Sequence, residues 1–469
     1  MSKWIIRKKD EFIDALNKRD VKKMRALFNN VPTVDLAEFA NEIDEPSKLT
    51  FIFKSVPSEL TADFFTELDD KTQEALLKIF SDDQLVKLIN ESYTDDIVDC
   101  LEDMPANLVT RALKLVPKDR RDSVNRLLNY KEDTAASIMT TEYFELHSDI
   151  TVEEAIKIIR EKGKKAETVF TLFLRDKHRT LVGTVDLDDL IFANPKQKLE
   201  EIKNKEFLFT KVDTDQEEVA DKFKKYDLHA LAVVNNEQKL VGVITVDDIM
   251  DVIERETSED IALQSGVIPL KDEYDDVPAW RMALKCAPWL IILIIIGVFS
   301  SLVISKFEDK IKQIVVLAAF IPVIMDTGGN AGGQTCSIII RSLALKEFNV
   351  KDFWKVVWKE IRVAIMTGLM VAIVSFGAFI AEMSIPGLIN FEDGTISQKV
   401  VVAAIVASTL FFAILIAKFV ACILPFIAKK FKKDPALMSE PFVTTIVDFC
   451  ALLIYFGIVT LVLNIAGIN

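Results

Sequence analysis

The chain has few of the residues from which soft-metal sites, disulfide scaffolds and nucleophilic active sites are built. It contains three histidines and five scattered cysteines, and no two cysteines form a CxxC pair. These absences exclude a disulfide framework and a zinc site of the usual ligand spacing. No apolar stretch follows the charged segment Met1–Asp10, so we expect no secretory signal peptide and a front half that stays in the cytosol.

A surplus of basic residues is missing from the front of the chain. Residues 280–469 carry 17 Lys and Arg and 12 Asp and Glu, which is a net charge of +5. Because the whole chain has 57 basic and 71 acidic residues, the remaining 40 basic and 59 acidic groups give residues 1–279 a net charge of −19. The acidic front excludes nucleic acid as a partner, and its junction with an apolar rear excludes an ordinary cytosolic enzyme.

Five long uncharged runs lie in the rear of the chain. They are Cys286–Ser305, Gln313–Ile340, Val363–Ala381, Val400–Ala417 and Pro441–Asn469, and only Asp326 and Asp448 interrupt them. A bilayer core about 30 Å thick is crossed by about 20 apolar residues in a helix. We therefore predict an α-helical membrane domain with five transmembrane helices over residues 279–469, surrounded by the lipid bilayer.

The loops between these runs differ in charge. The loop after the second run and the loop after the fourth are the richest in Lys and Arg, and such loops stay in the cytoplasm. Five spans then place the N-terminus in the cytoplasm and the C-terminus outside the plasma (inner) membrane. Lys418 lies near the cytoplasmic end of the fourth run, and we expect its side chain to snorkel to the interface, with pore lining as the alternative.

Residues 1–130 and residues 131–253 follow different patterns. The first carry short units with apolar residues three or four apart, such as Ser81–Ile89, which indicate an all-α superhelical N domain. In the second, Leu181–Leu190 resembles Leu240–Ile249, and each copy follows a helix-like stretch and a strand-like run. This repeated β-turn-β-helix unit resembles a pair of CBS (cystathionine-β-synthase) domains, which have an α/β fold.

The resemblance to CBS domains implies a nucleotide site. In such domains the spacing of Gly242, Thr245 and Asp248 often holds a nucleotide ribose, so Thr245 and Asp248 are candidate ligands for ATP. The first copy has Asp186 where the threonine would stand, which departs from a pair of equal sites. A purely structural or dimerising CBS pair is the alternative.

Residues 254–278 connect the CBS pair to the first membrane run. From Asp248 to Glu273 acidic residues outnumber basic ones, and apolar residues recur on one side as far as Leu263, which predicts a helix. A solvated acidic face is the ordinary interpretation. Carboxylates packed at a domain interface repel one another unless cations bind between them, so sensing of a divalent cation is the second interpretation.

Two features of the membrane runs point to a cation. Asp448 is a carboxylate in an apolar span, where a charge costs about 2.5 kcal/mol or more, so it must face a cavity, a partner or an ion. Thr444 lies one turn earlier on the same helix face. The segment from Asp326 to Thr335 contains four glycines, which permit close helix packing or a helix break. In a homodimer, two copies of Asp448 about one axis would hold a hydrated Mg²⁺ ion.

Longer motifs match a known family. The segments Gly328–Thr335 (GGNAGGQT) and Asp434–Asp448 (DPALMSEPFVTTIVD) resemble signatures of MgtE-type magnesium channels, and so do Tyr130–Met139 and Asp213–Glu218. The resemblance implies a homodimer whose pore lies on the dimer axis, with Asp448 and Thr444 lining it and Asp434 on its cytoplasmic side. We group Asn330 and Asp326 with these pore residues. The chain departs from the family at Gly333, where a polar residue is usual, and at Asp326, where a small residue is common.

The resemblance also implies regulation by the transported ion. In the family, cytosolic Mg²⁺ bridges acidic residues of the N domain, the CBS pair and the connecting plug helix, and so closes the pore. The matching positions here are Asp95, Asp96, Asp99, Asp215, Glu217, Asp227, Asp248, Asp251, Glu256, Glu259 and Asp260.

We therefore expect a Mg²⁺-selective channel or transporter, and not an enzyme, that takes up magnesium across the plasma membrane. One alternative is a gradient-coupled transporter of another divalent cation such as Co²⁺, or a Na⁺/Mg²⁺ exchanger. Another is a nucleotide-regulated membrane enzyme or an anion channel. The spans contain no HExxH or GxSxG motif, and their charges are acidic apart from Lys418, which argues against the second alternative.

Overall fold

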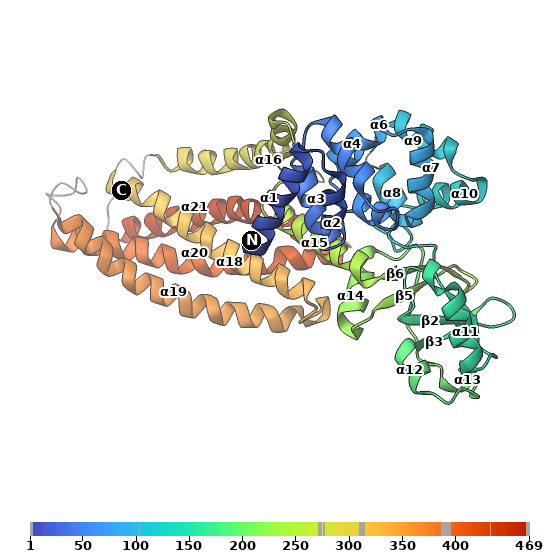
Figure 1. Cartoon of the computed structure of the whole chain (residues 1–469). Helices are drawn as coiled ribbons and strands as arrows, with labels where there is room; N and C mark the ends of the chain where they lie inside the picture. The colour runs from blue at the N-terminus through green and yellow to red at the C-terminus, as the bar shows by residue number, and fades with distance from the viewer. Residues whose placement is uncertain are drawn as a thin grey trace. The chain divides into compact units, whose positions relative to one another are not determined.

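The protein is described by a computed structural model that covers residues 3–102, 104–270, 274, 277–308, 315–385, 395–431 and 433–465. The chain divides into two compact units, Met1–Glu254 and Arg255–Asn469 (Figure 1). The first holds a helical domain followed by two small sheets, and the second is entirely helical among the described residues. The expected multidomain fold class is confirmed.

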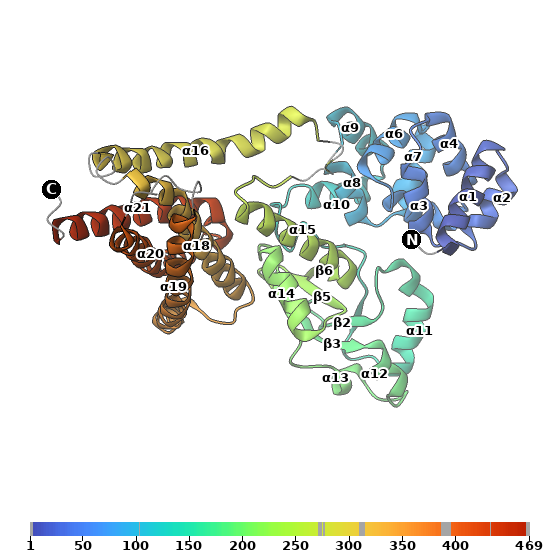
Figure 2. The same ribbon diagram turned by 90° about the vertical axis from the view of Figure 1, so that its left-hand side faces the viewer.

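The first unit begins with a series of short helices. They are α1 (Lys3–Asn17), α2 (Val21–Phe28), α3 (Thr33–Asn41), α4 (Pro46–Ser55), α5 (Thr61–Thr66), α6 (Asp70–Ile79), α7 (Asp82–Glu91), α8 (Thr94–Glu102), α9 (Ala106–Leu115) and α10 (Lys118–Leu127). Helices two apart in the chain pack together, as α3 does on α5 and α5 on α7. Each buries one apolar stripe against such a neighbour, which is the packing of a superhelix. Figure 2 shows this succession from a second direction.

Two three-stranded sheets follow and repeat one topology. In the first, β1 (Glu145–His147) is parallel to β2 (Thr171–Arg175), which is antiparallel to β3 (Leu181–Asp186). The second pairs β4 (Phe209–Lys211), β5 (Ala230–Val234) and β6 (Leu240–Thr245) in the same way. The register shifts at Leu174/Arg175 in one copy and at Val233/Val234 in the other. The internal repeat read from the sequence is therefore a structural repeat.

Helices flank both sheets. They are α11 (Val152–Lys162), α12 (Leu187–Phe192), α13 (Leu199–Ile202) and α14 (Gln216–Tyr226). Thr151 and Asp215 cap α11 and α14, because their side chains accept hydrogen bonds from Glu154 N and Glu217 N; such caps fix where a helix begins. The helix expected over residues 254–278 is α15, Val246–Gln264, which starts directly after β6 and passes from the first unit into the second. Residues 271–273 and 275–276 of that expected segment lie outside the described residues.

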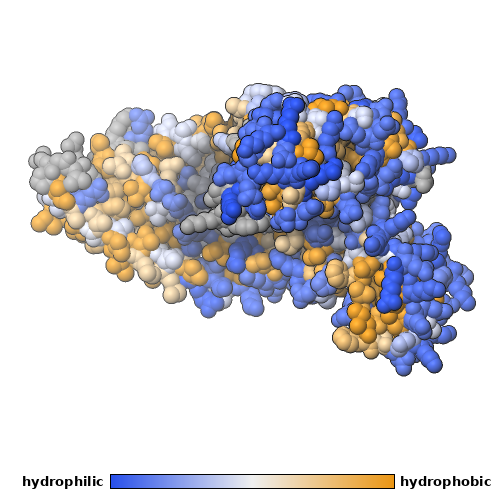
Figure 3. Space-filling model, viewed as in Figure 1, coloured by the Kyte–Doolittle hydropathy of each residue, from blue (hydrophilic) through white to orange (hydrophobic). Residues whose placement is uncertain are grey.

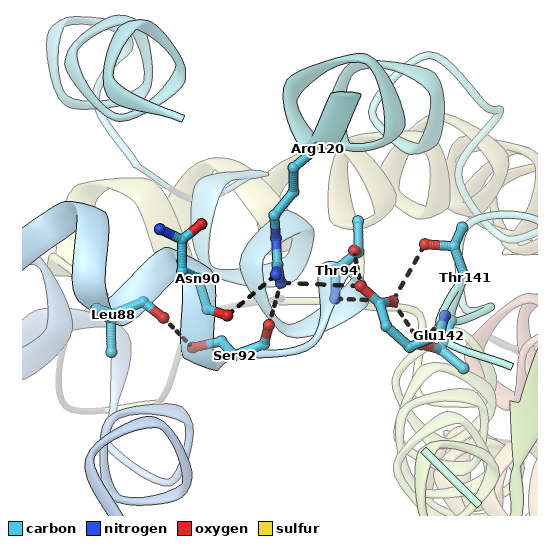
Figure 4. A network of polar contacts seen from close by, with 8 residues as sticks. Leu88, Asn90, Ser92, Thr94, Arg120, Thr141 and Glu142 are labelled. Atoms are coloured by element: carbon cyan, nitrogen blue, oxygen red, sulfur yellow. Dashed lines mark hydrogen bonds and ion pairs between the residues drawn. The ribbon is translucent and has the colours of Figure 1, made fainter. Parts of the chain in front are cut away.

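Glu142 joins the helical domain to the first CBS repeat (Figure 4). Its carboxylate accepts hydrogen bonds from Thr94 Oγ1 and, at 3.4 Å, from the Thr94 amide at the start of α8. Thr141 Oγ1 donates to it at 3.1 Å, and Arg120 Nη2 of α10 lies 3.8 Å from it. Arg120 also donates to the carbonyl oxygens of Asn90 and Ser92. The Glu142 carboxylate thus accepts the hydrogen bond of a free amide at the N-terminus of α8, although Glu142 does not belong to that helix.

The second unit contains five helices that are long and apolar enough to cross a membrane, counted among the described residues. They are α16 (Ala279–Lys306), α18 (Ile321–Ala344) with the 3₁₀ turn η3 (Val315–Phe320), α19 (Phe353–Ser384) with η4 (Val350–Asp352), α20 (Ile396–Lys430) and α21 (Glu440–Ile465). Residues 313–314 and 466–469 of the expected runs lie outside the described residues. α18, α20 and α21 pack on one another, α19 covers α20, and α16 packs on α21.

The outer surface of this unit is apolar, as a lipid-facing surface must be. In α19, Met366, Met370, Ile373 and Val374 are exposed. Figure 3 shows apolar side chains over this part of the chain and hydrophilic ones over the N-terminal helices. The polar residues of α18 and α21 are therefore exceptions that require an explanation.

Replacing Glu142 with alanine should loosen the start of α8. The variant loses the acceptor for the Thr94 amide, and a lost N-terminal cap costs about 1 kcal/mol, or roughly a fivefold increase in local opening. Hydrogen exchange of the peptide containing residues 94–102 should accelerate by that factor in the full-length protein. Glu145→Ala is the matched control, because Glu145 pairs with Arg175 inside the first repeat. Equal exchange in Glu142→Ala and the wild type would contradict this role.

Candidate functional site

The glycines of α18 bring this helix against α21. A Cβ atom added at Gly329 would lie 2.6 Å from Thr444 Cγ2, and one at Gly332 would lie 3.2 Å from Val447 Cγ2. Helix α18 runs without a break from Ile321 to Ala344. Of the two roles open to the glycines, the geometry therefore supports close helix packing, which small residues allow in membrane helices.

Polar side chains form two matching rows on these helices. α18 carries Asp326, Asn330 and Gln334, and α21 carries Glu440, Thr444 and Asp448; both rows have i, i+4, i+8 spacing, which places each row on one helix face. We call these six residues the polar seam. Its α18 members and Glu440 are exposed in the single chain, although both helices belong to the candidate membrane spans.

The two rows run antiparallel, so the start of one row lies beside the end of the other. Gly329 faces Thr444 and Asp448, whose Oδ1 would lie 3.6 Å from a Cβ at Gly329. Gly333 faces Glu440, whose Oε1 would lie 2.5 Å from a Cβ at Gly333. The departure at Gly333 thus leaves room for the Glu440 carboxylate. The carboxylates of Asp326 and Asp448 interact electrostatically.

Asp448 is the seam residue that has a buried oxygen without a described hydrogen-bond partner. Its Oδ1 is buried and accepts no hydrogen bond from the described residues. A carboxylate oxygen at membrane depth needs a proton, a water or a cation. The oxygen donors of the seam are hard ligands of the kind that Mg²⁺ prefers, and no His or Cys belongs to it.

Asp326, Asn330, Thr444 and Asp448 were predicted from the sequence, whereas Glu440 and Gln334 were not. Extending the i+4 spacing by one turn from Thr444 and from Asn330 would have found both. Asp434 lies elsewhere: it caps the 3₁₀ turn η5 (Pro435–Leu437) by accepting a hydrogen bond from Ala436 N at 2.8 Å.

Lys418 does not snorkel, so that prediction was wrong. Its side chain is buried, and Nζ donates to Thr335 Oγ1 of α18 at 2.9 Å. Thr335 in turn donates to Glu360 Oε2 of α19 at 3.4 Å, and all three residues are buried. The hydroxyl of Thr335 gives the ammonium group a partner inside the bundle, which removes the cost of leaving that group unpaired.

A second set of acids gathers in the first unit, where the N domain meets the CBS pair. Asp95 and Asp96 of α8 interact electrostatically with Asp248 of α15 and with Glu142, and Asp95, Asp96 and Asp248 all act on Glu167. We call these five residues the acidic junction. Of the predicted regulatory residues, Asp95, Asp96 and Asp248 are thus brought together, whereas Glu142 and Glu167 were missed because no spacing links them to α8.

Burial and repulsion between carboxylates raise pKa values in the acidic junction. Burial and then the charge of Asp248 raise the pKa of Asp96 to about 6. Burial, followed by the charges of Asp95, Asp248 and Asp96, raises the pKa of Glu167 to about 9. Burial raises the pKa of Asp248 to about 6, and raises that of Asp95 well above its usual range. Either protons or a cation must offset this repulsion.

The described side chains of the acidic junction do not form a complete metal-coordination site. Among the described residues, no three His, Cys, Asp or Glu side chains are arranged to hold an ion directly. Two buried oxygens, Asp95 Oδ1 and Glu167 Oε2, nevertheless lack hydrogen-bond partners there. This fits a hydrated Mg²⁺, which keeps several waters and takes few direct carboxylates.

The remaining predicted regulatory residues have separate settings. Asp215 caps α14, and Asp227 ends that helix in the left-handed region at φ +51°. Asp251 acts electrostatically on Glu67, whose pKa is raised by burial and then by that charge. Partial burial, then the charges of Asp434 and Glu259, raise the pKa of Asp260 to about 6. Asp99, Glu217 and Glu256 lie on α8, α14 and α15.

The two candidate nucleotide ligands bond to each other. Thr245 Oγ1 donates to Asp248 Oδ2 at 2.5 Å, and the Thr245 amide donates to the same oxygen at 3.4 Å. In the first repeat Thr171 Oγ1 donates to Asp186 Oδ1 at 2.8 Å. In this structure Thr245 and Asp248 therefore stabilise the start of α15, and the same Asp248 belongs to the acidic junction.

Comparisons with known proteins cover both units. Family models match at residues 31–133 (MgtE intracellular N domain), 135–196 and 199–255 (CBS domain) and 321–458 (divalent cation transporter). The magnesium transporter MgtE of Thermus thermophilus is 35% identical over 375 residues, which is 79% of this chain and 80% of that protein. The Bacillus subtilis protein of the same name is 34% identical, covering 79% of each chain.

A solved structure agrees with these matches. The crystal structure of the soluble part of a magnesium transporter covers 54% of this chain and 99% of its own, with 26% identity and a TM-score of 0.51. The family consists of membrane transporters. On the sequence identity and on the order of the matched domains, this chain belongs to the MgtE family of divalent cation transporters.

Proposed function

We propose that this chain forms a homodimeric Mg²⁺ uptake pathway in the plasma membrane, with Asp448 holding the ion. The observation that carries the proposal is the polar seam, with its unpartnered Asp448 oxygen. Lipid cannot cover three carboxylates in the membrane, so protein or water must. A second copy facing the seam would enclose a polar path and supply a second Asp448.

Magnesium is the cargo that this chemistry suits best. Mg²⁺ retains most of its waters and needs one or two carboxylates, which two copies of Asp448 would provide. The relatives in Thermus thermophilus and Bacillus subtilis carry the name magnesium transporter. A channel driven by voltage is the simpler mode, and a gradient-coupled transporter of Mg²⁺ or Co²⁺ is the second candidate.

Cytosolic Mg²⁺ would close this pathway by binding to the first unit. The acidic junction repels itself without a cation, so Mg²⁺ favours the arrangement that holds α8 and α15 together. A ligand shifts such an equilibrium only through its different affinity for the two states. The other regulatory carboxylates, from Asp215 and Glu217 to Glu259 and Asp260, would add further Mg²⁺ contacts. The N-terminus would then lie in the cytoplasm and the C-terminus outside, and ATP would compete for Thr245 and Asp248.

Asp448→Asn should strongly reduce Mg²⁺ uptake. The test uses right-side-out membrane vesicles loaded with a Mg²⁺ dye, under an imposed negative interior potential. Interactions with a charged group are worth about 1.5–3 kcal/mol, so the rate should fall roughly 10- to 100-fold. Glu382→Gln is the matched control, because it removes one carboxylate from α19, which carries no seam residue.

The outcomes separate the candidate modes. Voltage-driven uptake that Asp448→Asn reduces supports the channel, and uptake that also requires a counter-ion gradient favours the coupled transporter. Unchanged uptake in Asp448→Asn would remove this residue from the ion site.

Metal-free protein should become less stable as the pH rises. The folded-state pKa values of Asp96 and Asp248, about 6, and of Glu167, about 9, lie above the unfolded values. The folded state therefore binds more protons, and stability falls between about pH 4 and about pH 9. In chelator the protection factors of the α8 amides, taken relative to the intrinsic exchange rate at each pH, should fall over that range, and millimolar Mg²⁺ should restore them.

A matched pair of variants tests the source of this effect. Asp248→Asn should reduce both the pH dependence and the Mg²⁺ effect, whereas Asp189→Asn, at the equivalent position of the first repeat, should retain both. Limited proteolysis of α15 should also slow when Mg²⁺ is added. If Mg²⁺ did not change the protease accessibility of α15, closure through the acidic junction would be contradicted.

A further inference from the structure

Trp289 of α16 contacts two segments that are far apart in the sequence. Its indole Nε1 donates to Ser439 Oγ at 2.9 Å. Its ring lies beside Phe442, with centroids 6.3 Å apart at 45°. Its other neighbour is Gly266, two residues beyond the end of α15.

Gly266 is required by both its backbone and its neighbour. It ends α15 in the left-handed region at φ +72°. Gly266 N donates to Leu263 O at 3.0 Å and Val267 N to Ala262 O at 2.9 Å, which is the hydrogen-bond pattern of a Schellman cap. A Cβ atom at this position would lie 2.2 Å from Trp289 Cδ1. Only glycine thus lets the chain turn while the indole ring lies against it.

The segment after Gly266 is also fastened to α16. Lys285 Nζ donates to Pro269 O at 2.6 Å, and Ile268 N donates to Lys285 O at 3.4 Å. Leu263, in the last turn of α15, packs against the apolar cluster that includes Ala436 and Val443. The end of α15 is therefore held by both α16 and the start of α21.

Ser439 lies directly before the N-terminal end of α21. It is fully buried and immediately precedes Glu440, the first residue of the α21 row of the polar seam. A displacement of Ser439 shifts the helix that carries Thr444 and Asp448. The Trp289 indole touches both Gly266 and Ser439.

We infer that Trp289 is a positioning residue that couples the end of α15 to α21 and so sets how much cytosolic Mg²⁺ is needed for closure. The inference rests on the proposed function. The contacts hold the end of α15 against the membrane helices, which is the arrangement expected of the closed state. Weakening them should leave conduction intact and make closure harder.

The test measures closure separately from conduction. Right-side-out vesicles, whose lumen is the cytosolic side, are loaded with a series of Mg²⁺ concentrations, and initial uptake is measured for each. Trp289→Phe keeps an aromatic ring but removes the pyrrole part of the indole with its Nε1–H donor. One hydrogen bond corresponds to about a 2- to 10-fold change in an equilibrium, so the lumenal Mg²⁺ that halves uptake should rise by that factor. Uptake at the lowest lumenal Mg²⁺ should stay within about twofold, because the bond lies outside the seam.

Two further variants sharpen the result. Gly266→Ala must displace the indole ring and should raise the midpoint in the same direction. Trp280→Phe is the matched control, because Trp280 lies on the same helix and is exposed; its midpoint should equal that of the wild type. A merely structural role would lower uptake at every Mg²⁺ concentration without moving the midpoint.

The outcomes distinguish this inference from the proposal beneath it. Wild-type uptake that lumenal Mg²⁺ does not inhibit would overturn closure by Mg²⁺ itself. Wild-type inhibition with an unchanged midpoint in Trp289→Phe and Gly266→Ala would overturn the coupling role alone.

Discussion

A carboxylate at membrane depth is the constraint on which the second unit depends. Asp448 has a buried oxygen without a described partner, and burying it against lipid would cost several kcal/mol. The glycines of α18 reduce the distance between two helices until a polar row on each lies beside the other. Lys418 and Glu360 obey the same constraint by a different solution, since they find a shared partner in Thr335 inside the bundle.

The acidic junction likewise brings carboxylates together partly away from water, here outside the membrane. Its acids are half-buried or buried together, and among the described residues an arginine, Arg120, pairs with one of them, Glu142. Glu142 is also the residue that fastens α8 to the CBS pair. One small region therefore contains both the bond that joins the two domains and the repulsion that opposes the join. Under the proposed closure, a divalent cation would change the balance between these two effects without creating a new interface.

The sequence predicted what depends on local pattern. Charge-free length defined the five membrane helices, and the repeated Leu181 and Leu240 segments defined the two sheets, since hydrophobic length and β-α periodicity are properties of contiguous residues. Strands β1 and β4 escaped notice because three residues carry no periodicity. The burial of Lys418 could not be foreseen, because its partners are on α18 and α19. The meeting of Glu167 with Asp95 likewise depends on tertiary packing that no spacing encodes.

Helix α15 belongs to both units, and this has a mechanical consequence. It has 19 residues, so at 1.5 Å per residue it is about 28 Å long. Asp248 lies in its first turn and Leu263 in its last, with no proline between them. An unbroken helix of this length behaves as a stiff lever. A tilt of about 5° at the Asp248 end would move the far end by about 2.5 Å, which is comparable to the helix shifts that accompany switching in other proteins. Under the proposed closure by Mg²⁺, a change at the acidic junction would reach Leu263 as a rigid displacement, without any helix having to unfold.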